Sequence, residues 1–391
     1  MLKYFRFLNN TATFLVILTL SVSCFAELST QTWTVVTSSN DLNFPRFAVS
    51  ENGSLIMKYS EGQHTVDETY HSIKSDDWAI TWYSPEYVYV DAYASGLASC
   101  TVGTGPVLSA GFNTTVSSVN SKIINFRILR SWDDFTTGFN TRSTIEFPFD
   151  PNTFHFHGDM TYLADGDILA TGYGTRQGNT KGEVMLISSS DNGVTWQYRS
   201  TMIAYESSLM HPDTAPSEPE MMQLSNGNLL CVARCGDINP PVALDPEDVP
   251  MWYAISTDLG YTWSTPVSLG VPGVSPRLEL LDDGRVAMSY GRPNVYLRLA
   301  DYTGTNWQEP ILVYEGVGSG YTGLRKTPEG DLLIAYAESD FAGADKPGDE
   351  NYINITKIAI NPCEGAYFEA DLNKDCAVDL LDYAVIADNW L

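Results

Sequence analysis

Short apolar runs recur along the chain, and pairs of them are separated by an Asp-Gly, Asn-Gly or Glu-Gly dipeptide. These dipeptides end at five glycines, which are Gly53, Gly166, Gly227, Gly284 and Gly330. Apolar runs on both sides of such a dipeptide are typical of β-hairpins. The first interval between the glycines, 113 residues, is about twice the next two, 61 and 57. We therefore predict one further unit near residues 100–150 that lacks this glycine.

A second repeat, S-x-D-x-G-x-T-W, occurs at residues 189–196 and 256–263. Residues 75–82 keep all of it except the glycine, and a fainter copy ends at Trp307. Asp and Gly favour a tight turn with positive φ, and Ser and Thr hydroxyls can hydrogen-bond to turn backbone. The repeat therefore predicts a recurring turn, with its Trp packed on the sheet, and has no catalytic role.

Both repeats recur in phase within residues 27–360, and no helical period accompanies them. Five visible hairpin units and the inferred sixth favour an all-β fold, a six-bladed β-propeller with four short strands in each blade. A tandem of β-sandwiches is the alternative, but it would not repeat both markers in phase. We expect residues 32–36 to close the ring against strands that end near 353–360.

The N-terminal residues 1–26 have the pattern of a secretory signal peptide. Lys3 and Arg6 precede an apolar stretch, 14–26, that is too short to span a bilayer, and cleavage is plausible after Ala26. We therefore expect a secreted or extracytoplasmic protein. Cys24 leaves a lipid-anchored form at the cell surface as the alternative.

The C-terminal residues 361–391 carry a different pattern, with oxygen ligands at positions 1, 3, 5, 9 and 12 of a calcium-loop spacing. The side chains at these positions are Asp371, Asn373, Asp375, Asp379 and Asp382. A helix-like stretch follows, so the segment resembles one half of an EF-hand-like dockerin module. This resemblance implies bound Ca²⁺ and a cohesin-like or cell-surface partner; the alternative is an acidic surface tail.

The formal net charge of −26 argues against nucleic acid or an anionic membrane as a partner. An acidic substrate would therefore need a local cluster of arginines. No zinc-binding His/Cys pattern or Gly-rich nucleotide loop is visible, so we expect no cofactor in catalysis. Five cysteines follow the signal segment, and the best disulfide pair is Cys363–Cys376, which leaves at least one thiol without a partner inside the chain.

The hairpin repeat also fixes which residues meet at the propeller axis, because the innermost strands of all blades line it. Glu218 and Tyr321 each lie nine residues before a hairpin glycine, so a carboxylate is expected to face a phenol. Arg46 lies seven residues before such a glycine, and Arg234 and Arg292 lie seven and eight residues after one. The sequence therefore predicts a cleft that contains three arginines, a Glu and a Tyr.

Three segments carry a family resemblance: residues 44–49 (FPRFAV), 218–234 and 320–336. Together with the S-x-D-x-G-x-T-W repeats, which resemble Asp-boxes, they make roughly residues 30–360 similar to the sialidase (neuraminidase) family. The resemblance implies that Arg46, Arg234 and Arg292 bind a substrate carboxylate through planar guanidinium groups. It also implies that Tyr321 is the nucleophile, Glu218 its base and Asp67 the acid/base.

Several of these assignments have competitors nearby in the sequence. Glu220 competes with Glu218, Arg277 and Arg298 compete with Arg292, and Glu61 and Glu68 compete with Asp67. His155, His157 and Asp159 begin an inner strand, and they either line the pocket or are ordinary polar residues at a strand end.

The function that the resemblance implies is a secreted exo-glycosidase that releases a terminal sialic acid, or another nonulosonic acid, with retention. One alternative keeps the site but changes the substrate to a different acidic sugar, because three arginines select only a carboxylate. The other alternative is a non-catalytic carbohydrate-binding propeller at the cell surface.

Overall fold

The computed structural model describes residues 29–50, 53–63, 68–83, 98–100, 107–111, 114–131, 139–237, 249–292, 294–316, 320–338 and 350–360. The predicted signal segment, the C-terminal calcium loop, the Cys363–Cys376 pair and Asp67 lie outside these residues. Within them the regular elements are β-strands, and no helix is long and apolar enough to cross a membrane.

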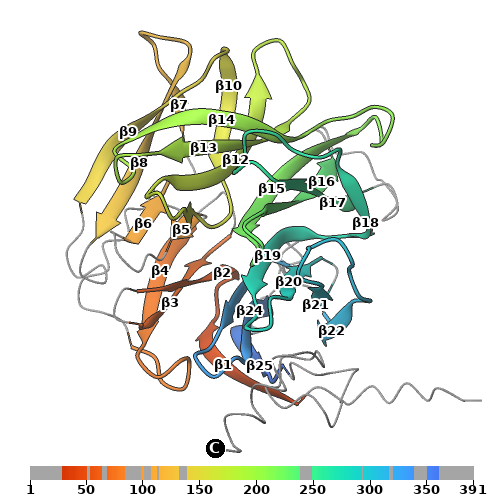
Figure 1. The fold of residues 1–391 in the computed structure, drawn as a ribbon. Helices are drawn as coiled ribbons and strands as arrows, with labels where there is room; N and C mark the ends of the chain where they lie inside the picture. Colours follow the sequence, from red (N-terminus) through yellow and green to blue (C-terminus); the bar gives the residue numbers. More distant parts are fainter. Residues whose placement is uncertain are drawn as a thin grey trace, which may run out of the picture.

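The strands form six groups, here called blades one to six, around a common centre (Figure 1). Blade one contains β2 (Leu42–Val49), β3 (Leu55–Glu61) and β4 (Thr69–Ser75). Blade two contains β5 (Ala98–Cys100), β6 (Val107–Ala110), β7 (Thr115–Val116), β8 (Ile123–Ser131) and β9 (Phe139–Glu146). Blade three contains β10 (Pro151–Phe156), β11 (Thr161–Tyr162), β12 (Ile168–Arg176), β13 (Glu183–Ser189) and β14 (Thr195–Ala204).

Blade four contains β15 (Thr214–Gln223), β16 (Leu229–Asp237), β17 (Pro250–Ser256) and β18 (Val267–Pro272). Blade five contains β19 (Val274–Leu280), β20 (Val286–Gly291), β21 (Val295–Ala300) and β22 (Ile311–Tyr314). Blade six contains β23 (Thr322–Lys326), β24 (Leu332–Glu338), β25 (Asn351–Ile358) and β1 (Thr30–Ser38).

The N-terminal strand closes the ring, as predicted. β1 pairs antiparallel with β25, with Thr32 opposite Thr356 and Val36 opposite Ile353. The two ends of the described chain thereby share one sheet, in which every other pair of neighbours is also antiparallel. The described strands of blade two fall between residues 98 and 146, and they supply the sixth unit that the glycine spacing predicted.

Blades two and three are joined more closely than six separate blades would be. The start of β14 pairs in parallel with β9 from Thr195–Thr144 to Gln197–Glu146, so the two blades form one ten-stranded sheet. The pairing satisfies backbone groups that an isolated edge strand would leave exposed.

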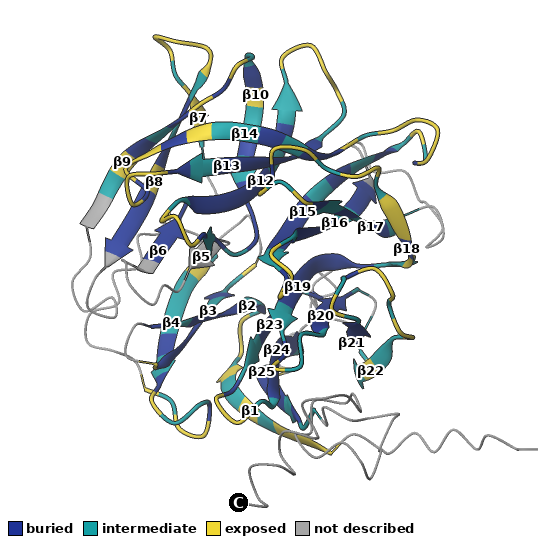
Figure 2. Ribbon diagram, in the orientation of Figure 1, coloured by how far each residue is buried: buried dark blue, intermediate teal, exposed yellow. Residues whose placement is uncertain are grey.

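The hydrophobic core lies between neighbouring blades, and each of the six blade–blade interfaces of the described residues contains one cluster. Strands next to the innermost ones, such as β20 and β24, are therefore buried on both faces, as Figure 2 shows, and their sequences are almost continuously apolar. The outer strands β1, β18 and β22, in contrast, each contain exposed residues. This arrangement holds the inner ends of the blades rigidly around the axis.

The S-x-D-x-G-x-T-W repeats form the predicted turns. In the first repeat the Asp191 carboxylate accepts hydrogen bonds from Thr195 N and Thr195 Oγ1 at 2.8 and 2.7 Å, and Asp258 does the same for Thr262. Trp196 is 1% exposed in the interface between blades two and three. The repeat is therefore part of the scaffold.

Candidate active site

Residues at one repeat position meet at the centre of the ring. The residues nine positions before the hairpin glycines are Phe44, His157, Glu218, Ser275 and Tyr321, from five different blades. The Tyr321 ring contacts the rings of Phe44 and His157, with centroids 4.6 and 6.4 Å apart. Ser275 N donates to Glu218 Oε2 at 3.1 Å, and Ser275 Oγ lies 3.4 Å from His157 Nε2. These contacts place all five side chains where the blades converge.

A backbone irregularity turns these side chains toward the axis. Phe44, Glu218 and Ser275 have φ values of 55°, 46° and 45°, and each lies at a register shift between the inner strand and its neighbour. A proline follows each of them, which suits a bulge because proline has no N–H to donate to the ladder. Non-glycine residues with positive φ are strained, and such strain is concentrated at functional sites.

Tyr321 and Glu218 are directly hydrogen-bonded. Tyr321 Oη donates to Glu218 Oε1 at 2.5 Å, and Arg234 donates to the same oxygen at 2.7 Å. With Ser275 N on the second oxygen, the Glu218 carboxylate has three donors, and its side chain is 8% exposed. The carboxylate is therefore fixed in position beside the phenol.

The electrostatics of this pair keep the proton on the phenol in the resting site. Burial alone raises the pKa of Glu218, but the charge of Arg234 and the hydrogen bond from Tyr321 lower this pKa to about 2. Burial and the Glu218 charge raise the pKa of Tyr321 well above its usual value. Glu218 is thus an ionised acceptor at neutral pH, aimed at the proton of a neutral phenol.

Arg292 lies over the Tyr321 ring, with its Cζ atom 5.8 Å from the ring centroid. Blades five and six approach each other closely at this point, since a Cβ atom on Gly320 would lie only 2.7 Å from Arg292 N. The absence of a side chain at Gly320 allows this approach, which places Arg292 beside Tyr321. The competing arginines lie elsewhere. Arg298 donates to two backbone carbonyls away from the axis residues, and Arg277 binds Glu220.

Arg46 is 5% exposed and lies deeper than the other two predicted substrate arginines. Its guanidinium contacts His157 Nε2 at 3.2 Å and Ser275 Oγ at 3.3 Å. His157 Nδ1 lies 3.0 Å from the Pro219 carbonyl, which can only accept, so the Nδ1 atom carries the proton and Nε2 accepts from Arg46. Burial, and then the Arg46 charge, lower the pKa of His157 to about 3. A neutral histidine therefore orients Arg46 without cancelling its charge.

A second layer of charges lies beneath these residues. Glu220 and Arg277 lie seven residues before their hairpin glycines, and they form a buried ion pair. Asp159, at the same position of blade three, donates its backbone N–H to Glu220 at 2.8 Å and forms ion pairs with Arg277 and Arg325. Arg325 also pairs with Glu279 at 3.2 Å. Glu220, the competitor of Glu218, therefore belongs to this supporting layer.

Other candidates from the sequence contact neighbours outside the Tyr321–Glu218 pair. Glu61 accepts a hydrogen bond from Asn40, which lies between β1 and β2, and Glu68 accepts one from Tyr70 of blade one. His155 packs against Tyr173 rather than Tyr321. Among the described residues, no group of three His, Cys, Asp or Glu side chains could hold a metal ion.

The structure adds two residues, Phe44 and Ser275, that the sequence interpretation did not assign to the site. The signal for both was present. Each occupies the nine-residue position of Glu218 and Tyr321, and each precedes a Pro and a charged residue, in Phe44-Pro-Arg and Ser275-Pro-Arg. His157 shares the nine-residue position, and the sequence alone leaves two roles open for it, in the pocket lining or as an ordinary polar residue at a strand end.

Comparison with known proteins places this site in a sialidase-related fold. The chain is 30% identical to sialidases of two Vibrio cholerae serotype O1 strains over 181 residues, which covers 40% of this chain. The chain spans only 23% of the length of these curated relatives. It is a distant homologue of them. No family model matches the chain.

Solved structures show the same architecture. The Hadza microbial sialidase Hz136 superposes with a TM-score of 0.57 at 18% identity, covering 81% of this chain and 65% of that one. The Penicillium chrysogenum alpha-L-arabinanase in complex with arabinobiose has a TM-score of 0.55 at 17% identity, with coverages of 83% and 98%. The fold is therefore that of sialidase and arabinanase propellers, which confirms the propeller that the repeats predicted.

The buried, neutral state of His157 predicts a pH dependence of folding stability. The pKa of His157 is about 3 in the folded protein and 6.5 for a free histidine. The unfolded chain therefore binds more protons between these values, so this group destabilises the fold as the pH falls from about 6.5 toward 3. We expect His157→Gln, whose amide oxygen can still accept from Arg46, to lose less stability than the wild type between about pH 7 and about pH 5.

Denaturant unfolding at both pH values measures the difference. An equally steep loss of stability in the wild type and the variant would show that His157 is not held neutral.

Proposed function

We propose that this chain is a glycoside hydrolase of the exo-α-sialidase type, which releases a terminal acidic sugar with retention. The hydrogen bond between Tyr321 Oη and Glu218 Oε1, within a cluster of three arginines, is the observation that carries the proposal. A tyrosine paired with a buried carboxylate is an activated nucleophile, and tyrosine nucleophiles are known among sialidases. The sequence relationship to bacterial sialidases supports the same assignment.

The three arginines bind the substrate carboxylate in this proposal. Arg234 and Arg292 are partly exposed beside Tyr321, and Arg46 is buried below with His157 as its neutral acceptor. The positive charge of the three arginines exceeds the negative charge of Glu218. The site therefore attracts an acidic sugar, although the protein as a whole is acidic. A neutral phenol also avoids the repulsion that a carboxylate nucleophile would have with such a sugar.

In the first step Tyr321 Oη bonds to the anomeric carbon as the bond from that carbon to the leaving oxygen breaks. The phenol proton passes to Glu218, and the leaving oxygen takes a proton from Asp67. In the second step water attacks the anomeric carbon, gives a proton to Asp67 and displaces Tyr321, whose oxygen recovers its proton from Glu218. Two displacements at one carbon give retention.

Substrate binding itself would prepare the proton transfer. In the resting site Arg234 helps to lower the pKa of Glu218 to about 2, which makes Glu218 a weak base. A bound carboxylate would offset part of the charge of Arg234 and Arg292 and so raise this pKa. The site then becomes more basic only when the correct anionic substrate is present.

A different acidic monosaccharide is the second candidate substrate, since the arginines recognise the carboxylate and not the rest of the sugar. The arabinanase with a similar fold shows that related propellers can bind other sugars. A fluorogenic sialoside and a panel of uronic-acid glycosides distinguish the candidates. Glycan binding with no turnover of any of them would favour a non-catalytic binding propeller.

The Tyr321→Phe variant tests the nucleophile. We expect kcat on the preferred acidic glycoside to fall by at least about a hundredfold, because the attacking oxygen is gone, while KM changes little. The arginines remain, so Arg234 and Glu218 still form their ion pair. Turnover at the wild-type rate by this variant would exclude Tyr321 as the nucleophile.

We also propose that the protein is secreted and that the C-terminal loop from Asp371 to Asp382 binds Ca²⁺, for which carboxylate and amide oxygens are suitable ligands. Asp371→Ala should weaken calcium binding by about tenfold or more, as measured by calorimetry on the full chain. Asp388→Ala, which changes an acid outside the loop spacing, is the matched control. Equal calcium affinity in wild type and Asp371→Ala would exclude the loop.

A further inference from the structure

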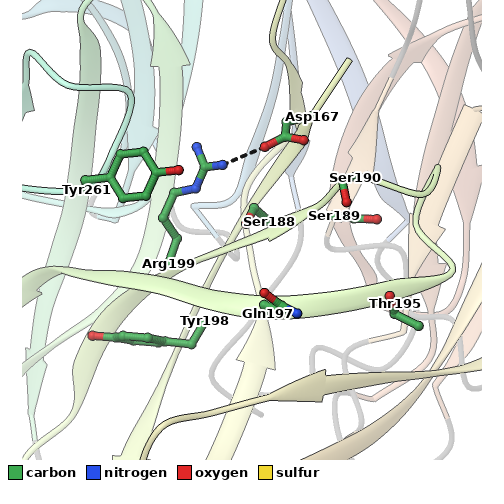
Figure 3. Close-up of a pocket in the computed structure, with 9 residues that line it drawn as sticks. All are labelled: Asp167, Ser188, Ser189, Ser190, Thr195, Gln197, Tyr198, Arg199 and Tyr261. Atoms are coloured by element: carbon green, nitrogen blue, oxygen red, sulfur yellow. Dashed lines mark hydrogen bonds and ion pairs between the residues drawn. The ribbon is translucent and has the colours of Figure 1, made fainter. Parts of the chain in front are cut away.

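A polar cavity of about 290 Å³ lies on blade three, between the Asp167 hairpin and the S-x-D-x-G-x-T-W turns of blades three and four. Figure 3 shows Arg199 between Tyr261 and Asp167, and Gln197 and Thr195 on one side of β14. The volume is just below the roughly 300–1,000 Å³ typical of small-molecule sites. It therefore suits a ligand of one or two sugar rings.

One wall of the cavity is held rigidly. Arg199 forms an ion pair with Asp167 at 2.7 Å, and it donates to the Leu259 carbonyl at 3.0 Å. The Arg199 Cζ atom lies 4.7 Å from the centroid of the Tyr261 ring. The Arg199 guanidinium thus contacts one face of the Tyr261 ring, while Tyr261 as a whole is 62% exposed. A fixed aromatic surface loses little conformational entropy when a ligand packs against it.

The lining has hydrogen-bonding groups but little net charge. The charged side chains that line the cavity, Asp167 and Arg199, neutralise each other. Ser190 and Gln197 are exposed and form no side-chain hydrogen bond with the described residues, so both remain available to a ligand. Hydroxyl and amide groups beside an aromatic ring match a saccharide, whose hydroxyls form hydrogen bonds and whose C–H face packs on the ring.

We propose that this cavity is a second carbohydrate-binding site, which takes an uncharged mono- or disaccharide unit with its ring packed on Tyr261. The neutral lining distinguishes it from the arginine cluster at the axis, which suits an acidic sugar.

The residues that line the cavity are only partly shared with the other S-x-D-x-G-x-T-W turns. Ser189, Asp191 and Thr195 recur in the second turn, where they build the scaffold. Arg199 does not recur, because the residue three positions after Trp263 is Pro266. The position of Tyr261 is occupied by Val194 in blade three and by Ile80 in blade one. The combination of Arg199 with Tyr261 is therefore specific to this interface.

The cavity lies at the opposite end of the blades from the Tyr321–Glu218 pair. Asp167 follows the hairpin glycine of blade three, whereas the axis residues lie nine positions before these glycines. In blade four the strand part of this step runs from Glu218 to Gln223, which is five residues. It spans roughly 17 Å, so one sugar ring cannot occupy both sites. A site on the far face would retain the protein on a branched or multivalent glycan and raise the local concentration of cleavable ends.

Binding of maltose, cellobiose, lactose and xylobiose to the full chain tests the proposal, with NMR titration up to about 20 mM sugar. We expect at least one disaccharide to bind with a Kd of roughly millimolar order. Tyr261→Ala should weaken this binding by about tenfold or more, and Gln197→Ala by a smaller factor. Tyr302→Ala is the matched control, since Tyr302 is 59% exposed in the corresponding region of blade five, and it should bind as the wild type does.

The proposal would be overturned if none of the four sugars bound, or if Tyr261→Ala bound them as tightly as Tyr302→Ala. The Tyr321→Phe variant should keep wild-type affinity for the neutral sugar. Failure at the second site is thereby separated from failure of the catalytic assignment, which concerns acidic glycosides and turnover.

Discussion

The convergence of the inner strands on one axis is the constraint on which the site depends. Five of the six blades contribute one side chain each at the same repeat position, so residues as distant in sequence as Phe44 and Tyr321 come into ring contact. The apolar layers between blades fix the inner ends, and the bulges at Phe44, Glu218 and Ser275 turn their side chains inward. The strain of positive φ at these positions is offset by packing in the rigid scaffold around them.

Two layers of polar side chains follow from this convergence, and they differ in charge balance. The upper layer combines Glu218 and Tyr321 with Arg234 and Arg292, so cations exceed anions where a substrate would enter. The lower layer pairs its arginines with Asp159, Glu220 and Glu279, and it supports the upper layer from below. Arg46 lies between the two, held by a neutral imidazole. Buried ion pairs contribute little net stability, but removal of one partner is costly, so the lower layer favours one fixed arrangement of the inner strands.

The sequence predicted the fold in most respects because the hairpin dipeptides and the turn repeats are local signals that recur with the blades. The sequence also placed Glu218, Tyr321 and Arg234 together, because their positions can be counted from the hairpin glycines. Glu218 and Tyr321 lie nine residues before such a glycine, and Arg234 lies seven residues after one. The parallel pairing of β14 with β9 could not be predicted, because it depends on how two blade edges approach in space. The bulges at Phe44, Glu218 and Ser275 could not be predicted either, because a Pro after a residue is compatible with several strand irregularities. The Pro that follows each of these residues is consistent with the bulge that the structure contains. Arg292 could not be separated from Arg277 and Arg298 by spacing alone; its place beside Tyr321 depends on the close approach of Gly320.

The proposed mechanism depends most directly on a covalent bond between Tyr321 and the sugar. A fluorinated sialosyl fluoride, which slows breakdown of a glycosyl-enzyme, would be incubated with the protein, and the labelled peptide would be identified by mass spectrometry. We expect one sugar attached to the oxygen of Tyr321. A sugar attached to Glu218 or to another carboxylate, or turnover of the acidic glycoside without any adduct, would contradict it.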